Sequence, residues 1–162
     1  MVMSEMLLRQ SQIAKLLDVD KGTVQYWRNK NLLVEKSNAP NRALISAKEL
    51  ADFLYYNPSY QTNIYKDSPD AYIQNIKEAI RLYIASRPQL YSKDMVMDAF
   101  DIAPDTLPTW IREGKITPVR GKPKAIRHVF TEQELERFTA NHPRYKKRLC
   151  KYQKEMRINR GV

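Results

Sequence analysis

Apolar residues recur three and four positions apart in two separate stretches of this chain. In the first stretch the apolar positions are Ile13, Leu16, Leu17, Val24 and Trp27. Such spacing places them on one face of each of two short, consecutive helices. The pattern therefore predicts a first helix, a tight turn that carries Val19 inward, and a second helix that begins at Asp20.

The second stretch repeats the first. Residues 8–33 align without a gap on residues 91–116, and almost every apolar position has an apolar counterpart. After a variable stretch the similarity resumes, and residues 45–53 align on residues 130–138. Self-similarity of this kind predicts two homologous domains.

Both copies continue into a third helix. Ser46 precedes Glu49, and Thr131 precedes Glu134, in the Ser/Thr-x-x-Glu pattern of a capping box. In this motif the hydroxyl and the carboxylate each bind a backbone N–H that the start of a helix leaves unpaired. A helix is therefore expected to begin at both positions.

Extended segments with a central loop, residues 33–45 and 116–130, separate the second and third helices of each copy. The order helix, turn, helix, hairpin and helix is typical of a winged helix-turn-helix domain. We place the first such domain at residues 7–56 and the second at residues 90–141. The expected fold class is α+β, mainly α.

The segment between the domains, residues 57–89, predicts a tyrosine-rich linker followed by a connecting helix. Ser68, Pro69 and Asp70 are typical of a helix start, and Pro88 ends the helix. Its apolar stripe consists of Ile73, Ile76, Ile80 and Tyr83 or Ile84. We expect this helix to pack against both domains and fix their separation. The linker tyrosines are interpreted as packing residues, with base stacking as the alternative.

The net charge of the chain indicates the class of partner that it binds. The 162-residue chain holds 28 Lys and Arg against 18 Asp and Glu, a net charge of +10 with a pI near 9.7. This indicates an anionic partner, nucleic acid first and a membrane surface second. The basic tail, residues 142–162, contains one acid, Glu155. Leu149, Tyr152 and Met156 have helical spacing there, so the tail is either a helical arm that contacts DNA backbone or a partner, or a solvated end.

Residue types that carry most enzymatic and metal chemistry are scarce. The chain has one cysteine, Cys150, two histidines, His128 and His142, and four glycines without a Gly-rich phosphate loop. We therefore expect no disulfide framework, no metal or drug sensor site, no cofactor and no enzymatic activity. The sequence has no pattern of a signal peptide or a membrane span. The expected setting is the cytoplasm, without membrane association.

The second helix of the first domain lies in DKGTVQYWRNKNLL and carries two core residues, Val24 and Trp27. Its polar side chains are left outside, where Arg can contact guanine, Gln can pair with adenine, and Lys or Thr can reach phosphates. A solvated polar face is the alternative, but the repeat and the net charge favour a DNA recognition helix. The residues expected to contact DNA here are Lys21, Gly22, Thr23, Gln25, Tyr26, Arg28, Lys30, Lys36, Asn41 and Arg42.

The second domain differs at the corresponding helix, which we expect to begin at Ala103. Pro108 removes a backbone N–H and is expected to distort the first turn, while Asp105 would repel phosphates. The loop that follows is richer in charge than its counterpart. We expect base reading by the helix of the first domain and backbone or minor-groove contact by the loop of the second. The residues expected to contact DNA here are Thr106, Thr109, Arg112, Lys115, Arg120, Lys122, Lys124 and Arg127.

Two pairs of segments resemble the first two helices of the MerR and excisionase superfamily. They are LRQSQIAKLLDV and YSKDMVMDAFDI for the first helix, and DKGTVQYWRNKNLL and APDTLPTWIREGKI for the second. The resemblance implies a winged fold whose second helix enters the major groove of double-stranded DNA. MerR regulators add a long dimerising helix and an effector site, which this sequence lacks. The second domain would then replace a partner subunit, giving an internal, pseudo-twofold dimer that is monomeric in solution.

A two-domain protein without an effector site is similar to the TraN-type accessory DNA-binding proteins of Gram-positive conjugative plasmids. This similarity implies an accessory or regulatory factor of conjugative transfer that binds near a transfer origin or promoter, with a relaxase or recombinase as an open second partner. The runner-up is an excisionase-like architectural factor or a phage or plasmid transcriptional repressor. An alternative of another class is a protein-interaction adaptor that retains the fold without DNA binding.

Overall fold

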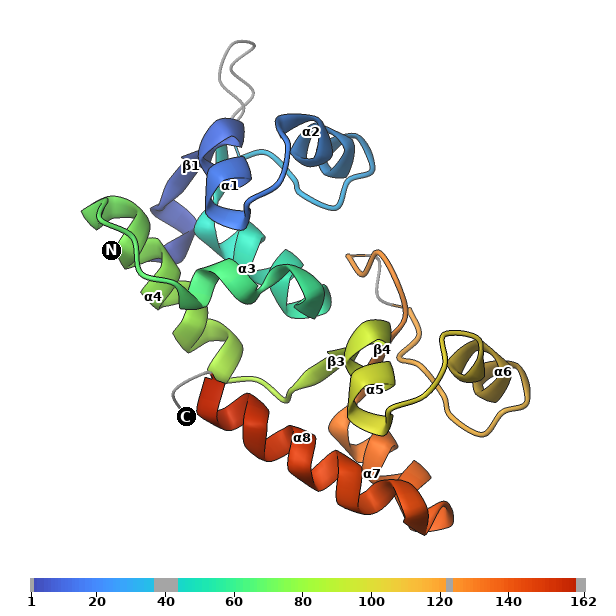
Figure 1. Cartoon of the computed structure of the whole chain (residues 1–162). Coiled ribbons are helices and arrows are strands. Elements are labelled where there is room, and N and C mark those ends of the chain that lie inside the picture. The colour runs from blue at the N-terminus through green and yellow to red at the C-terminus, as the bar shows by residue number, and fades with distance from the viewer. Residues whose placement is uncertain (1, 37–43, 122–123, 160–162) are drawn as a thin grey trace. The chain divides into compact units, whose positions relative to one another are not determined.

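The chain forms two compact units, seen in the computed structural model of Figure 1. The described residues are 2–36, 44–121 and 124–159. The first unit comprises Met1–Arg87 with Lys122–Ile126, and the second comprises Pro88–Gly121 with Arg127–Val162. The structure is mainly helical with two small antiparallel sheets, which confirms the α+β, mainly α class. Within the described ranges no helix is long and apolar enough to cross a membrane.

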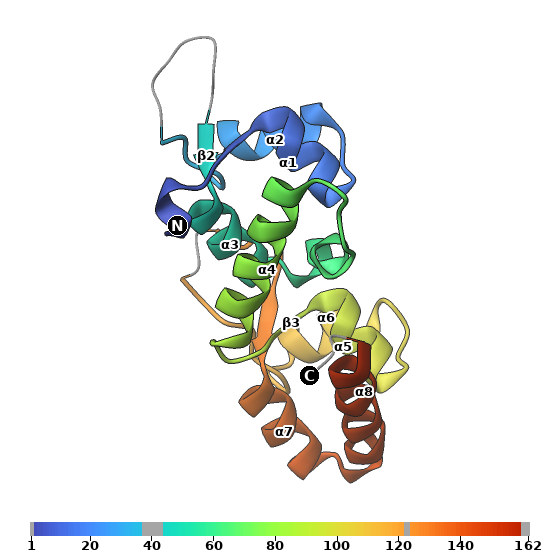
Figure 2. The same cartoon turned by 90° about the vertical axis from the view of Figure 1, so that its left-hand side faces the viewer.

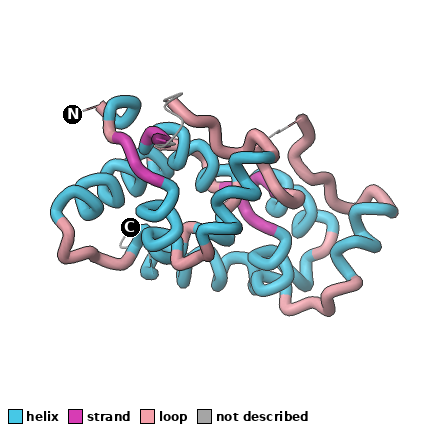
Figure 3. The backbone as a smooth tube through the Cα atoms, turned by 90° about the horizontal axis from the view of Figure 1, so that it is seen from above, coloured by secondary structure: helices cyan, strands magenta, loops and turns pink. Residues whose placement is uncertain are grey.

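The first unit joins a helix-turn-helix to a two-stranded sheet. Its elements are η1 (Met3–Glu5), β1 (Leu7–Arg9), α1 (Gln10–Leu17), α2 (Lys21–Asn29), β2 (Leu44–Ser46), α3 (Ala47–Tyr56), η2 (Pro58–Tyr60), η3 (Thr62–Tyr65) and α4 (Ala71–Ala85). Leu8 of β1 lies opposite Ile45 of β2, and both side chains are fully buried. Each strand, magenta in Figure 3, runs directly into a helix, drawn in cyan. The pairing of β1 with β2 therefore holds the start of α1 next to the start of α3.

The second unit begins with the same order of elements. These are β3 (Leu90–Ser92), α5 (Lys93–Phe100), α6 (Thr106–Arg112), β4 (Val129–Thr131), α7 (Glu132–Asn141), η4 (Pro143–Tyr145) and α8 (Lys146–Asn159). Tyr91 of β3 lies opposite Phe130 of β4, and both are buried. The order strand, helix, helix, strand, helix and 3-10 turn therefore occurs in both units.

Left-handed backbone positions shape the helix-turn-helix of each unit. The residue after α1 is Asp18 with φ 56°, and the residue after α5 is Asp101 with φ 52°. Asp adopts this conformation more readily than most residues because its short polar side chain can bond locally. A second left-handed residue follows each second helix, Asn31 with φ 59° and Gly114 with φ 74°. The two units therefore make the same two turns, the first with Asp in both and the second with Asn in one and Gly in the other.

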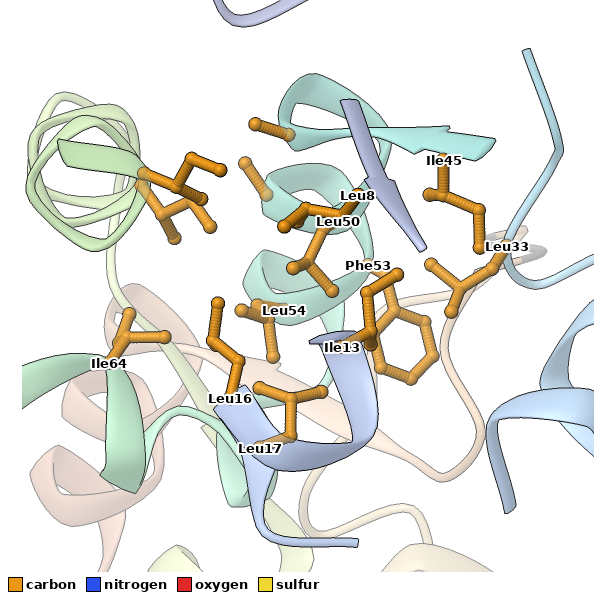
Figure 4. Packing of buried hydrophobic residues seen from close by; sticks show 14 of the residues in the cluster. Leu8, Ile13, Leu16, Leu17, Leu33, Ile45, Leu50, Phe53, Leu54 and Ile64 are labelled. Atoms are coloured by element: carbon orange, nitrogen blue, oxygen red, sulfur yellow. The ribbon is translucent and has the colours of Figure 1, made fainter. Parts of the chain in front are cut away.

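A tryptophan of the second helix forms the centre of the first core. Trp27 is 2% exposed, and its ring centroid lies 4.6 Å from that of Phe53 and 4.9 Å from that of Tyr60. Figure 4 shows side chains of β1, α1 and α3 gathered around Phe53 in the same cluster. Tyr60 belongs to the linker tyrosines, and Tyr72 donates its hydroxyl to the backbone oxygen of Leu7 at 2.7 Å. These contacts support the packing interpretation of the linker.

The second core has the same aromatic arrangement. The Trp110 ring lies 4.6 Å from Phe138 and 5.4 Å from Tyr145 between centroids. Both tyrosines of the 3-10 turns, Tyr60 and Tyr145, meet their tryptophan edge-on. The similarity between the two units therefore extends past the third helix, beyond the segments in which the sequence alignment recognised it.

Strand pairing differs from the predicted hairpin. The regular strands pair β1 with β2 and β3 with β4, so the strand before the first helix pairs with the strand before the third. The strands β1 and β3 were not predicted. At the base of each expected wing, the N–H of Lys36 donates to the Leu44 oxygen and that of Val119 to the Val129 oxygen, both at 2.8 Å. The winged hairpin itself stays a prediction.

The second helix of the second unit begins later than predicted. α6 starts at Thr106 rather than at Ala103, so Pro104 precedes the helix. Pro108 lies in the first turn, where backbone N–H groups have no partner within the helix, and it therefore costs no helical hydrogen bond. The consequence of the prolines is a shorter helix than α2.

The third helices begin at the predicted hydroxyl caps, but each glutamate has a different partner from the one predicted. Ser46 Oγ accepts the N–H of Glu49 at 3.1 Å, as expected. The Glu49 carboxylate, however, accepts the N–H of Val34 at 3.1 Å, and the Glu134 carboxylate accepts that of Thr117 at 2.7 Å. Each carboxylate thus ties the segment after the second helix to the start of the third.

The Glu134 carboxylate makes the stability of the second unit depend on pH. Hydrogen bonding from Arg137 lowers the pKa of Glu134; partial burial opposes this, and the Thr117 N–H lowers it further. Because this pKa lies below the ordinary value of 4.5, the stabilisation is complete above that value and is lost as the pH falls through the lower, folded-state pKa.

Replacing Glu134 with Gln should therefore lower the free energy of unfolding on the order of 1 kcal/mol at neutral pH, a difference that shrinks on acidification. Urea unfolding from neutral pH to about pH 3 measures both quantities. Glu136→Gln, at an exposed position of the same helix, should follow the wild type throughout. A wild-type pH profile for Glu134→Gln would contradict this assignment.

The connecting helix α4 has the predicted stripe but begins later than predicted, because Asp70 rather than Ser68 caps it. Asp70 accepts the N–H groups of Tyr72 and Ile73 at 2.9 and 3.2 Å. Ile76 and Ile80 are fully buried, and the helix packs on α3 of the first unit (Figure 2). Its expected contact with the second domain stays a prediction.

A polar cluster holds α4 to α3. Asp52 of α3 accepts hydrogen bonds from Tyr83 of α4 and, at 3.0 Å, from Lys48. The Arg87 guanidinium lies 4.4 Å from the centroid of the Tyr83 ring. Burial raises the pKa of Tyr83, and its hydrogen bond to Asp52 raises it further. The phenol is therefore held in its protonated form.

The described part of the basic tail is a helix that packs on the second unit. Leu149 is 2% exposed, and Tyr152 and Met156 pack against the same core. Arg148 donates to the Phe100 oxygen at 2.8 Å, and α8 lies alongside α5 (Figure 2). The helical interpretation is confirmed for Lys146–Asn159, and the solvated-end alternative is wrong for these residues.

Candidate nucleic-acid interface

The helix α2 has one narrow apolar side and a broad polar one. Val24 and Trp27 are buried in the first core, and Figure 1 shows α2 beside α1 at the margin of the first unit. Tyr26 is 55% exposed on the other side. The remaining exposed residues of the helix are Lys21, Gly22, Gln25 and Asn29, and the exposed Lys30 follows directly. This surface, with Tyr26, is called the α2 face below.

Arg28 is held inside the protein rather than on the α2 face. Its Nη1 donates to Gln10 Oε1 at 2.5 Å and to Gln25 Oε1 at 2.9 Å, and its Nη2 forms an ion pair with Glu35. The side chain is 18% exposed. The expectation that Arg28 points outward is therefore corrected: its guanidinium joins the start of α1, the middle of α2 and the segment after α2.

Sequence reasoning missed Gln10 and Glu35, the two partners that decide where Arg28 lies. Gln10 also donates to the backbone oxygen of Lys21 at 3.1 Å, across the helix-turn-helix. No periodic or motif signal marks either residue, because each is brought to Arg28 by the tertiary fold.

Gln25 and Asn29 form an ordered pair of amides on the α2 face. Gln25 Nε2 donates to Asn29 Oδ1 at 3.0 Å while Gln25 Oε1 accepts from Arg28. Each amide oxygen has a second lone pair and each amide nitrogen a second N–H. Both side chains therefore retain an acceptor and a donor for an external partner, in an orientation fixed by Arg28.

A cation and an aromatic ring lie beside these amides. Lys30 Nζ is 5.6 Å from the centroid of the Tyr26 ring. Lys21 is exposed at the start of the helix, and Thr23 is partly buried. Lys36 donates to the backbone oxygen of Ser4, so its ammonium group already has a partner within the unit.

Comparisons with protein-family models, with curated proteins and with solved structures gave no significant match.

The corresponding helix of the second unit presents a different surface. Thr109 Oγ1 donates to the Asp105 oxygen at 2.9 Å and accepts from Arg112 at 3.4 Å. Lys115 forms an ion pair with Glu113 at 3.0 Å, and Thr106 is partly buried. Thr109, Arg112 and Lys115 are thus engaged with neighbours in the same segment.

The loop residues predicted to contact DNA have different surroundings. Arg120 and Arg127 are exposed. Lys124 belongs to the first unit, where its Nζ lies 2.5 Å from Glu49 Oε1. The predicted contact residues Asn41, Arg42 and Lys122 lie outside the described residues.

Across the described ranges, no group of three or more His, Cys, Asp and Glu side chains comes together that could hold a metal ion.

Proposed function

We propose that the protein binds double-stranded DNA in a sequence-specific manner through the α2 face, without a cofactor. The observation that carries this proposal is the ordered amide pair of Gln25 and Asn29, flanked by Tyr26, Lys21 and Lys30. A short helix packed by one narrow side leaves its other side able to enter a major groove. The net charge of +10 favours association with a polyanion.

The amide pair suits adenine. An Asn or Gln side chain recognises adenine by accepting from N6 and donating to N7, which needs one oxygen and one N–H from the same amide. Gln25 keeps both while Arg28 holds its oxygen. We therefore assign base reading to Gln25 and Asn29, with Lys21 and Lys30 contacting phosphates.

Arg28 then acts as a positioning residue rather than as a reader of guanine. Direct contact with guanine would require it to leave Glu35 and Gln10, which would leave the Glu35 carboxylate without its ion-pair partner. Holding Gln25 in place also reduces the side-chain entropy that base recognition would otherwise cost.

The second unit supplies backbone contact in this proposal. Its α6 face lacks an ordered amide pair among the described residues, whereas Arg120 and Arg127 are exposed in the loop that follows. Two DNA-contacting units in one chain would act as an internal dimer of winged helix-turn-helix domains. The chain would then bind as a monomer.

The proposed process is conjugative DNA transfer, with the protein as an accessory or regulatory factor near a transfer origin or promoter. Its support is the resemblance to TraN-type proteins. Burial raises the pKa values of Tyr83 and Tyr91, which makes these two side chains poor candidates for an activated tyrosine nucleophile.

Replacing Gln25 with Ala tests the assignment of base reading. At one adenine position of the preferred site, discrimination between adenine and the other bases should fall by about 1–3 kcal/mol, on the order of 5- to 150-fold. Equilibrium binding to a set of single-base variants of the site measures this. Gln133→Ala, an exposed glutamine on α7, should change nothing.

Arg28 has its own test in the same assay. Arg28→Met should weaken discrimination at the position read by Gln25, and Arg28→Lys, which retains a donor, should restore part of it. Loss of preference at a separate guanine position would show instead that Arg28 reads a base. Unchanged discrimination in Gln25→Ala would contradict base reading by the α2 face, whereas absence of sequence-specific binding by the wild type would favour a protein-interaction adaptor.

A further inference from the structure

Lysines line the side of α8 that faces away from the second core. Leu149 and Met156 mark the packed side of the helix. Lys147, Lys151 and Lys154 are exposed and follow one another at intervals of four and three residues. They therefore lie on one helical face and span about 10 Å along the axis. These three residues are called the lysine stripe.

The positive charge of the lysine stripe is not neutralised within the described part of the chain. None of its three ammonium groups takes part in the ion pairs formed there. The helix carries six Lys and Arg and one acid, Glu155. Arg148, by contrast, is engaged with the Phe100 oxygen and has a structural role.

We propose that the lysine stripe docks the sugar-phosphate backbone of duplex DNA, independently of sequence. The proposal rests on the proposed function only in taking duplex DNA as the partner. Lysine ammonium groups act as point charges that reach phosphates without a demanding geometry. A rigid row of them on a helix packed into a core neutralises several phosphates at once and releases counterions.

The packing of α8 disfavours the other anionic surfaces. An interfacial membrane helix inserts its apolar side, but here Leu149, Tyr152 and Met156 already pack in the second core. Ile158, which is 77% exposed, is the one large apolar residue that α8 exposes within the described part of the chain. Protein–protein interfaces usually depend on a few aromatic or Arg side chains that anchor the two partners. The lysine stripe contains neither, which disfavours a protein partner.

The test compares two triple variants with the same change in charge. One is Lys147→Gln, Lys151→Gln and Lys154→Gln; the control is Lys15→Gln, Lys66→Gln and Lys93→Gln, at positions outside α8. Fluorescence anisotropy on a short mixed-sequence duplex between about 50 and 200 mM salt gives the slope of log K against log salt. The stripe variant should lower the magnitude of that slope by about 2.7, at about 0.9 for each lost phosphate contact, and the control should leave it unchanged.

Three results would overturn the proposal. These are a wild-type slope in the stripe variant, an equal decrease in both variants, and absence of wild-type binding to the mixed-sequence duplex. Stronger binding of the wild type to phosphatidylserine vesicles than to DNA, lost in the stripe variant, would assign the stripe to membranes instead. Base discrimination, which Gln25→Ala is expected to reduce, is measured in a separate assay. The proposal for the lysine stripe can therefore be refuted while the proposal for the α2 face is supported, and the other way round. Circular dichroism confirms that both variants are folded.

Discussion

Replacing Trp27 with Ala is expected to lower the free energy of unfolding of the first unit by about 3–5 kcal/mol. The ring is 2% exposed and in contact with Phe53 and Tyr60, so its removal leaves a cavity between α2, α3 and the 3-10 turn. A loss of this size is a large part of the stability of an ordinary domain. Since α2 would lose its anchor, DNA binding should fall as well.

The adjacent Tyr26 provides the control. It is 55% exposed, and Tyr26→Ala should change the free energy of unfolding by less than about 0.5 kcal/mol. Urea unfolding followed by circular dichroism measures both variants. Equal midpoints for the two would contradict the placement of Trp27 at the centre of the core.

Replacing Leu149 with Ala is expected to destabilise the second unit by about 2–5 kcal/mol. Leu149 is 2% exposed on the side of α8 that packs against the second core, and Trp110, Phe138 and Tyr145 belong to the same cluster. Such a loss follows only if the tail helix is an integral part of this unit. An arm that orders on binding DNA would tolerate the change without loss of stability.

Ile158→Ala is the matched control on the same helix. Ile158 is 77% exposed, and its replacement should change stability by less than about 0.5 kcal/mol. Denaturant unfolding in the absence of DNA separates the two variants. If Leu149→Ala unfolds at the wild-type midpoint, α8 is a peripheral arm and the packing described above is wrong.

The sequence predicted the helices well because their packing is periodic. Ile13, Leu16 and Leu17 have helical spacing and are buried, as are Val24 and Trp27. The internal repeat strengthened each prediction, since two different sequences carry the same pattern. The start of the connecting helix was predicted to within a few residues, at Ser68 where Asp70 is the cap, because capping depends on residues close together in the chain.

The strands β1 and β3 were missed for a physical reason. Each is three residues long, too short for an alternating pattern, and is stabilised by a partner far along the chain. The predicted hairpins over 33–45 and 116–130 stay a prediction. In each, a backbone hydrogen bond joins the two arms, from Lys36 to Leu44 and from Val119 to Val129. Among the described residues of these segments, only the second arms form regular strands, β2 and β4, and these pair with β1 and β3.

Polar side chains were the least predictable part of the candidate site. Helical spacing indicates which way a side chain leaves the helix, but an Arg is long enough to turn back to partners that the fold supplies. Arg28 does so toward Gln10 and Glu35. Glu49 likewise leaves its own capping box for the N–H of Val34. Both outcomes depend on contacts between segments, which one sequence does not reveal.

The most direct test of DNA recognition by the α2 face is selection from a random pool of duplexes. Wild-type protein and a Gln25→Ala, Asn29→Ala double variant would be compared under excess competitor DNA, with matched folding confirmed by circular dichroism. The proposal predicts that the wild type enriches a defined motif containing adenine positions that the double variant no longer selects. Failure of the wild type to enrich any motif, or enrichment of an identical motif by the double variant, would contradict it.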